Sequence, residues 1–359
     1  MTSHPVPSPP SPSGPSDPSN PSNRSAAHGA DGGVSPALEL EGLRRDYVVR
    51  AAAPGSRRRR RRVVRAVDEI SLRVERGESV GFVGANGAGK STTIKMITGI
   101  LQPTAGSVRV LDRDPVPERR RLAREIGVVF GQRSQLWWDL PLRDSYRILG
   151  AMHRLTDRAL AERVGRLVEG LDLSGFLDRP VRQLSLGQRM RGEVAAALLH
   201  SPALVVLDEP TIGLDMVSKE GLRRFLREDR AERGTTLFLT THDMGDVERL
   251  CDRIVVVAEG QIAYDGALAG FRERLGSPRE LVLDLAAPHP AQLALPAGAR
   301  TLAIEAEGIR HRIAFSGAEL TVPALLTKVG TQVEVQDLSL TEPAVEDLVR
   351  RINAGDRPA

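Results

Sequence analysis

Several features that mark other classes of protein are scarce in this chain. It has 359 residues and a single cysteine, Cys251, so an internal disulfide is excluded and a reducing compartment fits. No apolar run approaches the ~18 residues that a membrane-spanning helix needs, so we expect that the chain forms no membrane pathway alone. The N-terminus has no basic start followed by an apolar stretch, which argues against a secretory signal.

Lysine is also scarce, although basic residues in general are not. Only four of the 50 basic residues are lysines, namely Lys90, Lys95, Lys219 and Lys328. The net charge is +4, and the six consecutive arginines at 57–62 carry more charge than that, so the rest of the chain is slightly acidic. The basicity is therefore local, and we expect no nucleic-acid partner. The arginine run is best interpreted as a solvated hairpin tip, with contact to anionic lipid headgroups as the alternative.

Changes in composition predict the domain organisation. Residues 1–36 are mainly Pro, Ser, Gly and Asn with almost no large apolar side chains, and we expect them to be disordered. Residues 37–276 contain apolar strands separated by helical patterns and form the main domain. Residues 277–359 are predicted to form a small α+β accessory module of an ordinary size for a compact unit.

The main domain is predicted to have an α/β fold. Apolar strands without alternation, separated by helices, indicate a parallel sheet covered on both faces. Strands are predicted at 79–83, 107–111, 126–130, 204–208, 236–241 and 254–258. Helices are predicted at 90–100, 143–153, 157–171, 188–200, 216–233 and 244–251. Alternating strands at 38–43 and 70–74, with a hairpin insertion at 51–62, suggest an added antiparallel layer. In the C-terminal module, strands are predicted at 281–285, 301–305, 312–315 and 332–335, and helices at 318–328 and 343–353.

A glycine-rich segment follows the strand at 79–83 and opens the next helix. It fits the pattern G-x-x-x-x-G-K-S with Gly84, Ala85, Asn86, Gly87, Ala88, Gly89, Lys90 and Ser91, and Thr92 comes next. Glycines let backbone N–H groups turn inward around phosphate oxygens, and the helix presents its positive N-terminus to the same anion. Lys90 is expected to reach the β- and γ-phosphates, and the Ser91 hydroxyl to ligate Mg²⁺. The strand–loop–helix context disfavours a chance glycine turn, and Lys95 is predicted to be a solvated helix residue.

Two acids, Asp208 and Glu209, stand at the carboxyl end of the apolar strand predicted at 204–208. A buried parallel strand delivers its terminal residues to the carboxyl edge of the sheet, where ligands bind in open α/β folds. We expect Asp208 to hold Mg²⁺ through water, and Glu209 to act as the general base that polarises the attacking water. In isolation, an acidic turn before Pro210 would be an equally good interpretation, but a phosphate loop in the same sheet favours the catalytic one.

From residue 37 to 276 the chain resembles the ABC transporter ATPase family. The segment Leu184-Ser-Leu-Gly-Gln188 is similar to the family signature Leu-Ser-Gly-Gly-Gln, with Leu186 in place of a glycine. The resemblance implies that Ser185, Gly187 and Gln188 contact the γ-phosphate held by an opposite subunit. Because the backbone N–H of Leu186 is retained, we expect function to be kept with some change in loop geometry.

Four further residues stand where the family has functional motifs. The resemblance implies that Gln132 senses Mg²⁺ and the attacking water, that Asp215 belongs to the D-loop, and that His242 is the switch histidine that contacts the γ-phosphate. Tyr47 is implied as the aromatic side chain that stacks on adenine. Gln135 is a weaker candidate than Gln132 by its spacing.

The family architecture implies an ATPase that uses ATP and Mg²⁺ and works as a dimer. Its fold is the P-loop NTPase fold of ABC type, with a parallel core sheet, an antiparallel β layer and a helical subdomain, followed here by the α+β module. The phosphate loop and the signature of one domain belong to different sites, so two domains must meet head to tail around two ATP molecules. The partner is a second copy or another ABC ATPase. Opening of this sandwich after hydrolysis can move a membrane partner.

Two further segments narrow the expected partner. Trp137 and Trp138 follow the Q-loop, where the family receives a coupling helix from the membrane subunit; ordinary core packing is the alternative. The segment Val335–Leu348 is similar to the tail of daunorubicin-resistance-type export ATPases, which work with separate ABC-2 permeases. The resemblance thus implies a subunit of an ABC-2 exporter, peripheral on the cytoplasmic face of the membrane. The alternatives are a non-transport ABC ATPase that acts on a macromolecular partner and a nucleotide-dependent regulator that does not hydrolyse ATP.

Overall fold

The computed structural model describes residues 35–52, 59–131, 133–274, 279–316 and 320–341. The predictions for the N-terminal tail up to residue 34, for Gln132 and for a helix at 343–353 lie outside these residues. Among the described residues, no helix is both long enough and apolar enough to cross a membrane.

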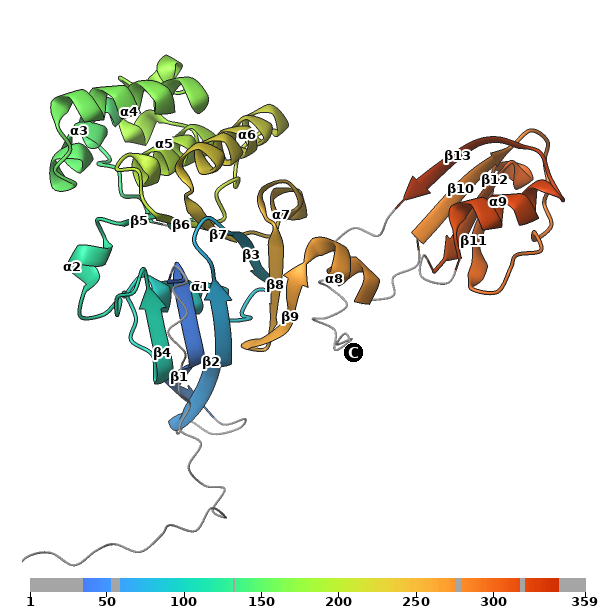
Figure 1. Cartoon of the computed structure of the whole chain (residues 1–359), viewed down its shortest axis with the longest axis horizontal. Helices are drawn as coiled ribbons and strands as arrows, with labels where there is room; N and C mark the ends of the chain where they lie inside the picture. Colours follow the sequence, from blue (N-terminus) through green and yellow to red (C-terminus); the bar gives the residue numbers. More distant parts are fainter. Residues whose placement is uncertain (1–34, 53–58, 132, 275–278, 317–319, 342–359) are drawn as a thin grey trace, which may run out of the picture. The chain divides into compact units, whose positions relative to one another are not determined.

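A six-stranded sheet forms the centre of the main domain, in the order β5-β6-β7-β3-β8-β9 (Figure 1). The strands are β3 (Ser79–Gly84), β5 (Ile126–Val129), β6 (Leu204–Asp208), β7 (Thr236–Thr240), β8 (Arg253–Ala258) and β9 (Gln261–Ala267). The first five in this order are mutually parallel, as predicted, and β9 pairs antiparallel with β8. Strand β9 and the helix that follows it, α8 (Leu268–Arg274), were not predicted from the sequence.

The central strands are apolar throughout because both faces of the sheet are covered. Val205 and Leu207 of β6 belong to a core cluster shared with the helices between residues 142 and 226. Val206, between them, points to the opposite cluster, where it packs with Phe82 and Phe238. Side chains alternate between the two faces of a strand, so a strand buried on both faces needs an unbroken apolar run.

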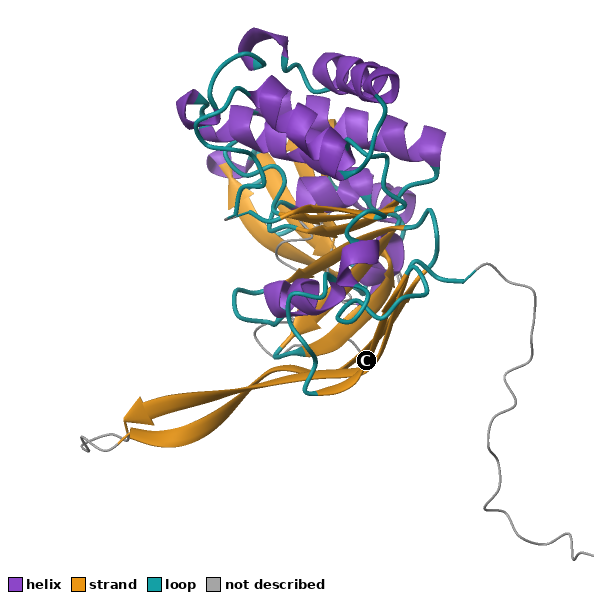
Figure 2. Cartoon of the chain, turned by 90° about the vertical axis from the view of Figure 1, so that its left-hand side faces the viewer, coloured by secondary structure: helices purple, strands orange, loops and turns teal. Residues whose placement is uncertain are grey.

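An antiparallel sheet of order β2-β1-β4 lies on one side of the parallel sheet, with β1 (Leu38–Ala52), β2 (Arg59–Val74) and β4 (Ala105–Val110). The strand predicted at 107–111 among those of the parallel sheet is therefore misplaced, because β4 pairs antiparallel with β1. The pairing of β1 with β2 runs from Leu38 opposite Val74 to Ala52 opposite Arg59, which confirms the predicted hairpin. Its outer part continues as a two-stranded ribbon (Figure 2). Arg61 and Arg62 are exposed on this ribbon.

The helices cover the sheet on its two faces. They are α1 (Lys90–Ile97), α2 (Arg119–Leu122), α3 (Leu142–Met152), α4 (Asp157–Gly170), α5 (Leu186–Leu198), α6 (Met216–Arg233) and α7 (Met244–Leu250), with short 3₁₀ turns at Ser174–Phe176 and Val181–Gln183. Helices α3 to α6 lie above the parallel sheet in Figure 1. The predicted bounds of α6 are confirmed, because Asp215 caps its start and Gly234, in the left-handed region, ends it. Helix α5 begins two residues before the predicted position 188, because Ser185 caps it.

The C-terminal module is an antiparallel sheet of order β11-β12-β10-β13 with one helix. Its elements are β10 (Arg279–Leu285), β11 (Ala299–Glu305), a 3₁₀ turn (Ala306–Gly308), β12 (Arg310–Phe315), α9 (Val322–Gly330) and β13 (Val335–Thr341). The predicted strand at 332–335 is wrong, because the Gln332 amide is bonded to the Lys328 and Ala294 carbonyls in the turn after α9. The helix predicted from 318 begins at Val322, where the Thr321 side chain caps it.

Candidate functional site

The phosphate-binding loop lies between β3 and α1, as predicted. Gly87 and Gly89 have φ values of 85° and 105°, a region that only glycine enters easily. A Cβ atom on Gly89 would lie 2.5 Å from the carbonyl oxygen of Ala66, so the backbone at this point excludes any side chain. Gly84, at the end of β3, is equally confined, since its Cβ would lie 2.2 Å from the carbonyl oxygen of Val257. The glycines of the motif are therefore required by the geometry of the loop.

Lys90 folds back over this loop from the first turn of α1. Its Nζ donates hydrogen bonds to the carbonyl oxygens of Gly84 at 2.6 Å and Ala85 at 3.0 Å. Burial lowers the pKa of Lys90, while the negative charges of Glu209 and Asp208 act to raise it. The lysine and the two acids therefore share one electrostatic environment at the edge of the sheet. Lys95, by contrast, is exposed, as expected for a solvated helix residue.

Asp208 is held at the carboxyl end of β6 by the neighbouring strand. Thr240 of β7 lies opposite it in the sheet and donates a 2.6 Å hydrogen bond from Oγ1 to Asp208 Oδ1. The carboxylate of Asp208 and the hydroxyl of Ser91 are hard oxygen donors of the kind that Mg²⁺ prefers, so the donor set fits this ion. Thr240 was not predicted from the sequence, where the only signal for it is a hydroxyl residue at the end of the adjacent strand.

Glu209 begins the loop after β6 with an unusual backbone conformation. Its φ of 57° lies in the left-handed region, which costs about 1–3 kcal/mol for a residue other than glycine. Its amide nitrogen donates to the Thr240 carbonyl at 2.8 Å, which continues the pairing of β6 with β7 by one residue. Gly131 lies against the same turn, where a Cβ would come within 3.2 Å of the Asp208 carbonyl.

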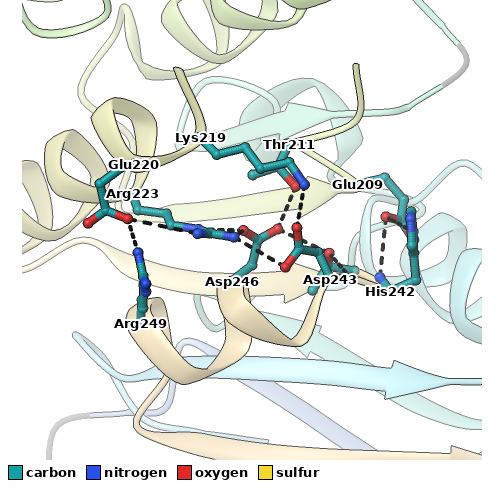
Figure 3. Close-up of polar contacts among 10 residues, drawn as sticks. Glu209, Thr211, Lys219, Glu220, Arg223, His242, Asp243, Asp246 and Arg249 are labelled. Atoms are coloured by element: carbon teal, nitrogen blue, oxygen red, sulfur yellow. Dashed lines mark hydrogen bonds and ion pairs between the residues drawn. The ribbon is translucent and has the colours of Figure 1, made fainter. Parts of the chain in front are cut away.

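His242 contacts Glu209 directly (Figure 3). The distance between His242 Nδ1 and Glu209 Oε2 is 2.6 Å, and the His242 amide nitrogen also donates to this oxygen at 3.3 Å. The His242 side chain is 76% exposed and that of Glu209 is 23% exposed. Burial raises the pKa of Glu209, whereas His242 acts to lower it. A carboxylate with a raised pKa is a stronger base, which suits the predicted role of Glu209.

The signature segment forms the N-terminus of α5. Ser185 Oγ accepts from the Gln188 amide nitrogen at 3.2 Å, and the Gln188 side chain accepts from the Ser185 amide nitrogen at 3.0 Å, a complete capping box. Leu186 is the first residue of the helix, and its side chain lies against Gly213, whose φ is 74°. Gly187 also adjoins Gly213, because a Cβ on it would lie 2.8 Å from the Gly213 carbonyl oxygen. The segment before α6 thus packs against the signature.

Asp215 serves as the cap of α6. It accepts hydrogen bonds from the Ser218 amide nitrogen at 2.8 Å and from Ser218 Oγ at 2.9 Å, and these bonds lower the pKa of Asp215. Tyr47 is half-buried on β1, with the guanidinium carbon of Arg45 5.0 Å from its ring centroid. These positions neither confirm nor contradict the roles predicted for Asp215 and Tyr47.

The segment after residue 132 is anchored by a buried acid that the sequence analysis did not identify. Glu193 of α5 accepts hydrogen bonds from Ser134 Oγ and from the Gln135 amide nitrogen, and burial raises its pKa. The Gln135 side chain donates to the Glu193 carbonyl at 3.2 Å and lies 3.4 Å from the Val128 carbonyl. Gln135 therefore has a structural role, which agrees with the lower preference given to it.

Trp137 and Trp138 lie on the surface. Their exposed fractions are 36% and 51%, so the alternative of core packing is wrong. The Arg189 guanidinium carbon lies 5.6 Å from the centroid of the Trp138 ring, and the Trp137 amide nitrogen donates to Ser145 Oγ at 3.2 Å. Cys251 follows α7, and burial raises the pKa of its thiol to about 12, so it is inert.

The phosphate loop, the two acids at the end of β6 and the histidine at the end of β7 define a P-loop nucleotide-binding protein. A family model described as ABC transporter matches residues 67–212. The chain is 34% identical over 214 residues to the ABC transporter ATP-binding protein NatA of Bacillus subtilis (strain 168), covering 60% of this chain and 87% of NatA. It is 39% identical over 228 residues to Nod factor export ATP-binding protein I of Burkholderia pseudomallei (strain 1710b), covering 63% and 73% respectively.

Solved structures show the same fold. One, described as the ATP binding subunit of an ABC transporter, matches with a TM-score of 0.57 and 26% identity, covering 67% of this chain and 93% of that one. Another is a dimeric post-hydrolysis state of the ATP-binding cassette MJ0796 bound to ADP and Pi, with a TM-score of 0.55, 26% identity, and coverage of 64% and 98%. The chain belongs to the ABC transporter family, and it is an ATP-binding ATPase subunit with the predicted fold.

Proposed function

We propose that the chain powers export through a separately encoded membrane permease of the ABC-2 type. The observation that carries the proposal is the juxtaposition of Lys90, Asp208 and the Glu209–His242 pair at one edge of the sheet, in a chain that also has a capped signature helix. The similarity to a Nod factor export ATP-binding protein supports export as the direction.

The residues at the sheet edge would divide the work of hydrolysis. The loop Gly84–Ser91 with Thr92 would bind the phosphates, with Lys90 on the β- and γ-phosphates. Glu209 would take the proton from the attacking water, and His242 would orient Glu209 and contact the γ-phosphate. Ser91, Asp208 and Gln132 would hold Mg²⁺, which neutralises charge that develops on the phosphates.

The second half of each site would come from a partner subunit. Ser185, Gly187 and Gln188 would contact the γ-phosphate in the partner's loop, Asp215 would lie at the same interface, and Tyr47 would stack on adenine. The dimeric structure of a similar cassette supports this arrangement. The partner is a second copy or a homologous ATPase.

We also propose a domain organisation and a location for the chain. Residues 37–276 would form the ATPase domain, with 1–36 as a tail and 277–359 as an accessory module. The subunit would bind the cytoplasmic face of the membrane through its permease, with Trp137 and Trp138 in the socket for the coupling helix. Exposed aromatic side chains of this kind are common anchors at protein interfaces.

The test is co-purification of the tagged chain with the membrane protein encoded beside it, followed by measurements of phosphate release and transport. We expect Trp137→Ala with Trp138→Ala to abolish co-purification and transport while basal ATP hydrolysis persists. Ile100→Ala, which alters an exposed apolar residue elsewhere in the domain, is the matched control. Unchanged association of the tryptophan variant would refute the socket. If the chain with its permease released no phosphate, a non-hydrolysing regulator would be favoured instead.

A further inference from the structure

The buried carboxylate of Asp246, to one side of the Glu209–His242 pair, connects three segments of the domain (Figure 3). Asp246 lies in the first turn of α7 and its side chain is fully buried. Its Oδ2 accepts hydrogen bonds from Thr211 Oγ1 at 2.6 Å and from Thr241 Oγ1 at 3.1 Å. Its Oδ1 accepts from Arg223 Nε of α6 at 2.7 Å. One carboxylate thus joins groups from two loops and a helix.

The partners of Asp246 stand next to the residues proposed for hydrolysis. Thr211 is two residues after Glu209, and Thr241 immediately precedes His242. Both hydroxyls converge on the same oxygen, so the loop after β6 and the loop after β7 are connected through a single atom. Asp246 itself contacts neither Glu209 nor His242 in any hydrogen bond that the structure shows.

Helix α6 is attached to the same point by its basic side chains. Arg223 is 5% exposed and contacts Asp246 and Asp243, the latter at 3.2 Å. Lys219 Nζ donates to the other oxygen of Asp243 at 2.5 Å. Because Asp243 follows His242 directly, the histidine is fixed from both sides, by Thr241 and by Asp243. Helix α6 begins at the Asp215 cap, so the same network reaches the predicted D-loop.

The charge and the lone pairs of the Asp246 carboxylate are both compensated. A buried carboxylate is tolerated when its lone pairs are satisfied and its charge is paired, and Asp246 has both kinds of compensation. Removing one hydroxyl leaves the ion pair intact but cuts the connection to one of the two loops.

We propose that Asp246 is a positioning residue for ATP hydrolysis: through Thr211 and Thr241 it holds the loop that follows Glu209 and the loop that carries His242 in one fixed register. The inference rests on the proposed function, because it takes Glu209 and His242 as the catalytic pair. Asp246 joins these two loops through the two threonine hydroxyls, and the connection is lost once either hydroxyl is removed.

The test compares Thr→Val, which keeps the shape and removes the hydroxyl, with Thr→Ser, which keeps the hydroxyl, at positions 211 and 241. Steady-state phosphate release by the full chain gives kcat and KM, and nucleotide titration and thermal unfolding are measured in parallel. We expect each valine variant to lower kcat about fivefold to tenfold, since Thr211→Val removes the bond to Asp246, and Thr241→Val removes that bond together with the one from the Asp243 amide nitrogen. The ATP affinity should stay within about twofold, and the serine variants should match the wild type within about twofold.

The double variant Thr211→Val with Thr241→Val decides between positioning and mere stabilisation. If Asp246 joins the two loops, the second substitution lowers kcat no further, and the double variant keeps the kcat of the slower single variant. Losses of kcat that multiply, or valine variants that lower the unfolding temperature but leave kcat unchanged, would overturn the proposal.

Failure of the proposed function would be recognised separately in the same assay. Glu209→Gln must be inactive while the wild type and the serine variants are active. Equal activity of Glu209→Gln and the wild type would remove Glu209 as the base, and the inference with it. An active wild type with fully active valine variants would remove the inference alone.

Discussion

Two acid–base pairs lie on neighbouring elements of this domain and differ in almost every physical respect. In the Glu209–His242 pair the histidine is 76% exposed and the glutamate 23% exposed, with a single contact between the two side chains. The Arg223–Asp246 pair is 5% and 0% exposed, and hydroxyls from Thr211 and Thr241 complete the shell of the carboxylate. The histidine placed for chemistry is thus accessible and sparsely bonded, while the Arg223–Asp246 pair is buried and fully bonded.

The backbone conformations of Glu209 and Asp246 also differ, one being strained and the other regular. Glu209 has a φ of 57° in a turn between Asp208 and Pro210, whereas Asp246 lies in a regular helix. Local strain of about 1–3 kcal/mol persists only where the surroundings hold it in place. Thr211, two residues further on, is attached to the buried carboxylate, which supplies such support.

The largest expected effect comes from the exposed pair. Replacing Glu209→Gln removes the base while the shape of the side chain is kept, so we expect kcat for ATP hydrolysis to fall at least about 100-fold. ATP should still bind, because Lys90 and the phosphate loop are untouched. Phosphate release and nucleotide titration measure the two quantities, and Glu162→Gln, at an exposed position on α4, is the matched control. A decrease in kcat of less than tenfold would show that another group serves as the base.

A substitution in the buried Arg223–Asp246 pair should, in contrast to one at Glu209, have a large effect on the stability of the fold. Asp246→Asn leaves Arg223 buried without its counter-charge and cannot accept all the hydrogen bonds of the carboxylate. We expect the free energy of unfolding to fall by about 3–5 kcal/mol, measured by urea denaturation. His242→Ala, at the exposed pair, should change this free energy by no more than about 0.5 kcal/mol. Similar losses for the two variants would abolish the distinction between the pairs.

The exposed pair could be predicted from the sequence and the buried one could not. Lys90, Asp208, Glu209 and His242 each follow a strand or a glycine loop, and parallel strands bring their carboxyl ends to one edge. Asp246, by contrast, is one of two acids in a short helix, and its partner Arg223 is 23 positions away on another helix. Only the packing of α6 against α7 brings the two together, and no local pattern encodes that packing.

The fold shows the same division between local and tertiary signals. Both ends of helix α6 were predicted to the residue, because its cap, Asp215, directly precedes the helix in the sequence and its terminating glycine, Gly234, directly follows it. The strand predicted at 332–335 was wrong because the side chain of Gln332 is used in a turn, with the carbonyl of Ala294 as a distant partner. Strand β9 was missed because it is only partly buried at the edge of the sheet, so its apolar pattern is weak.

A half-buried histidine, His200, differs from both pairs, because it is titratable and no carboxylate faces it in the part of the chain that the structure describes. His200 stacks on His153 with ring centroids 3.8 Å apart, and its Nε2 lies 3.0 Å from the Ile126 carbonyl, which can only accept, so Nε2 carries the proton. Burial, with a contribution from the neighbouring His153, lowers the pKa of His200 to about 4 from its ordinary value of 6.5. Between about pH 4 and pH 6.5, His200 is therefore mostly neutral in the folded chain and mostly charged in the unfolded chain.

The consequence is a loss of stability as the pH falls from 6.5 toward 4, since the unfolded state then binds more protons than the folded state. His200→Gln keeps a donor for the Ile126 carbonyl and removes the titration. We expect the unfolding free energy of the wild type to fall about 2 kcal/mol more than that of this variant between pH 7 and pH 4.5. Urea denaturation at the two pH values measures the difference. Parallel pH dependence in the two proteins would mean that His200 takes up its proton in the folded state as easily as in the unfolded one.

The smallest effect is expected at the outer end of the buried network. Arg249 of α7 forms an ion pair with Glu220 of α6, and both side chains are about half exposed (Figure 3). Solvent and salt screen such a pair, and holding two long side chains in one geometry costs entropy, so its net contribution is small. We expect Arg249→Gln to change the free energy of unfolding by less than about 0.5 kcal/mol and to leave kcat unchanged. A loss above about 1 kcal/mol would show that α6 and α7 are held together at their surface as well as at Asp246. The loss of stability in a variant would then depend on its place in the network between α6 and α7, and not on how deeply the ion pair is buried.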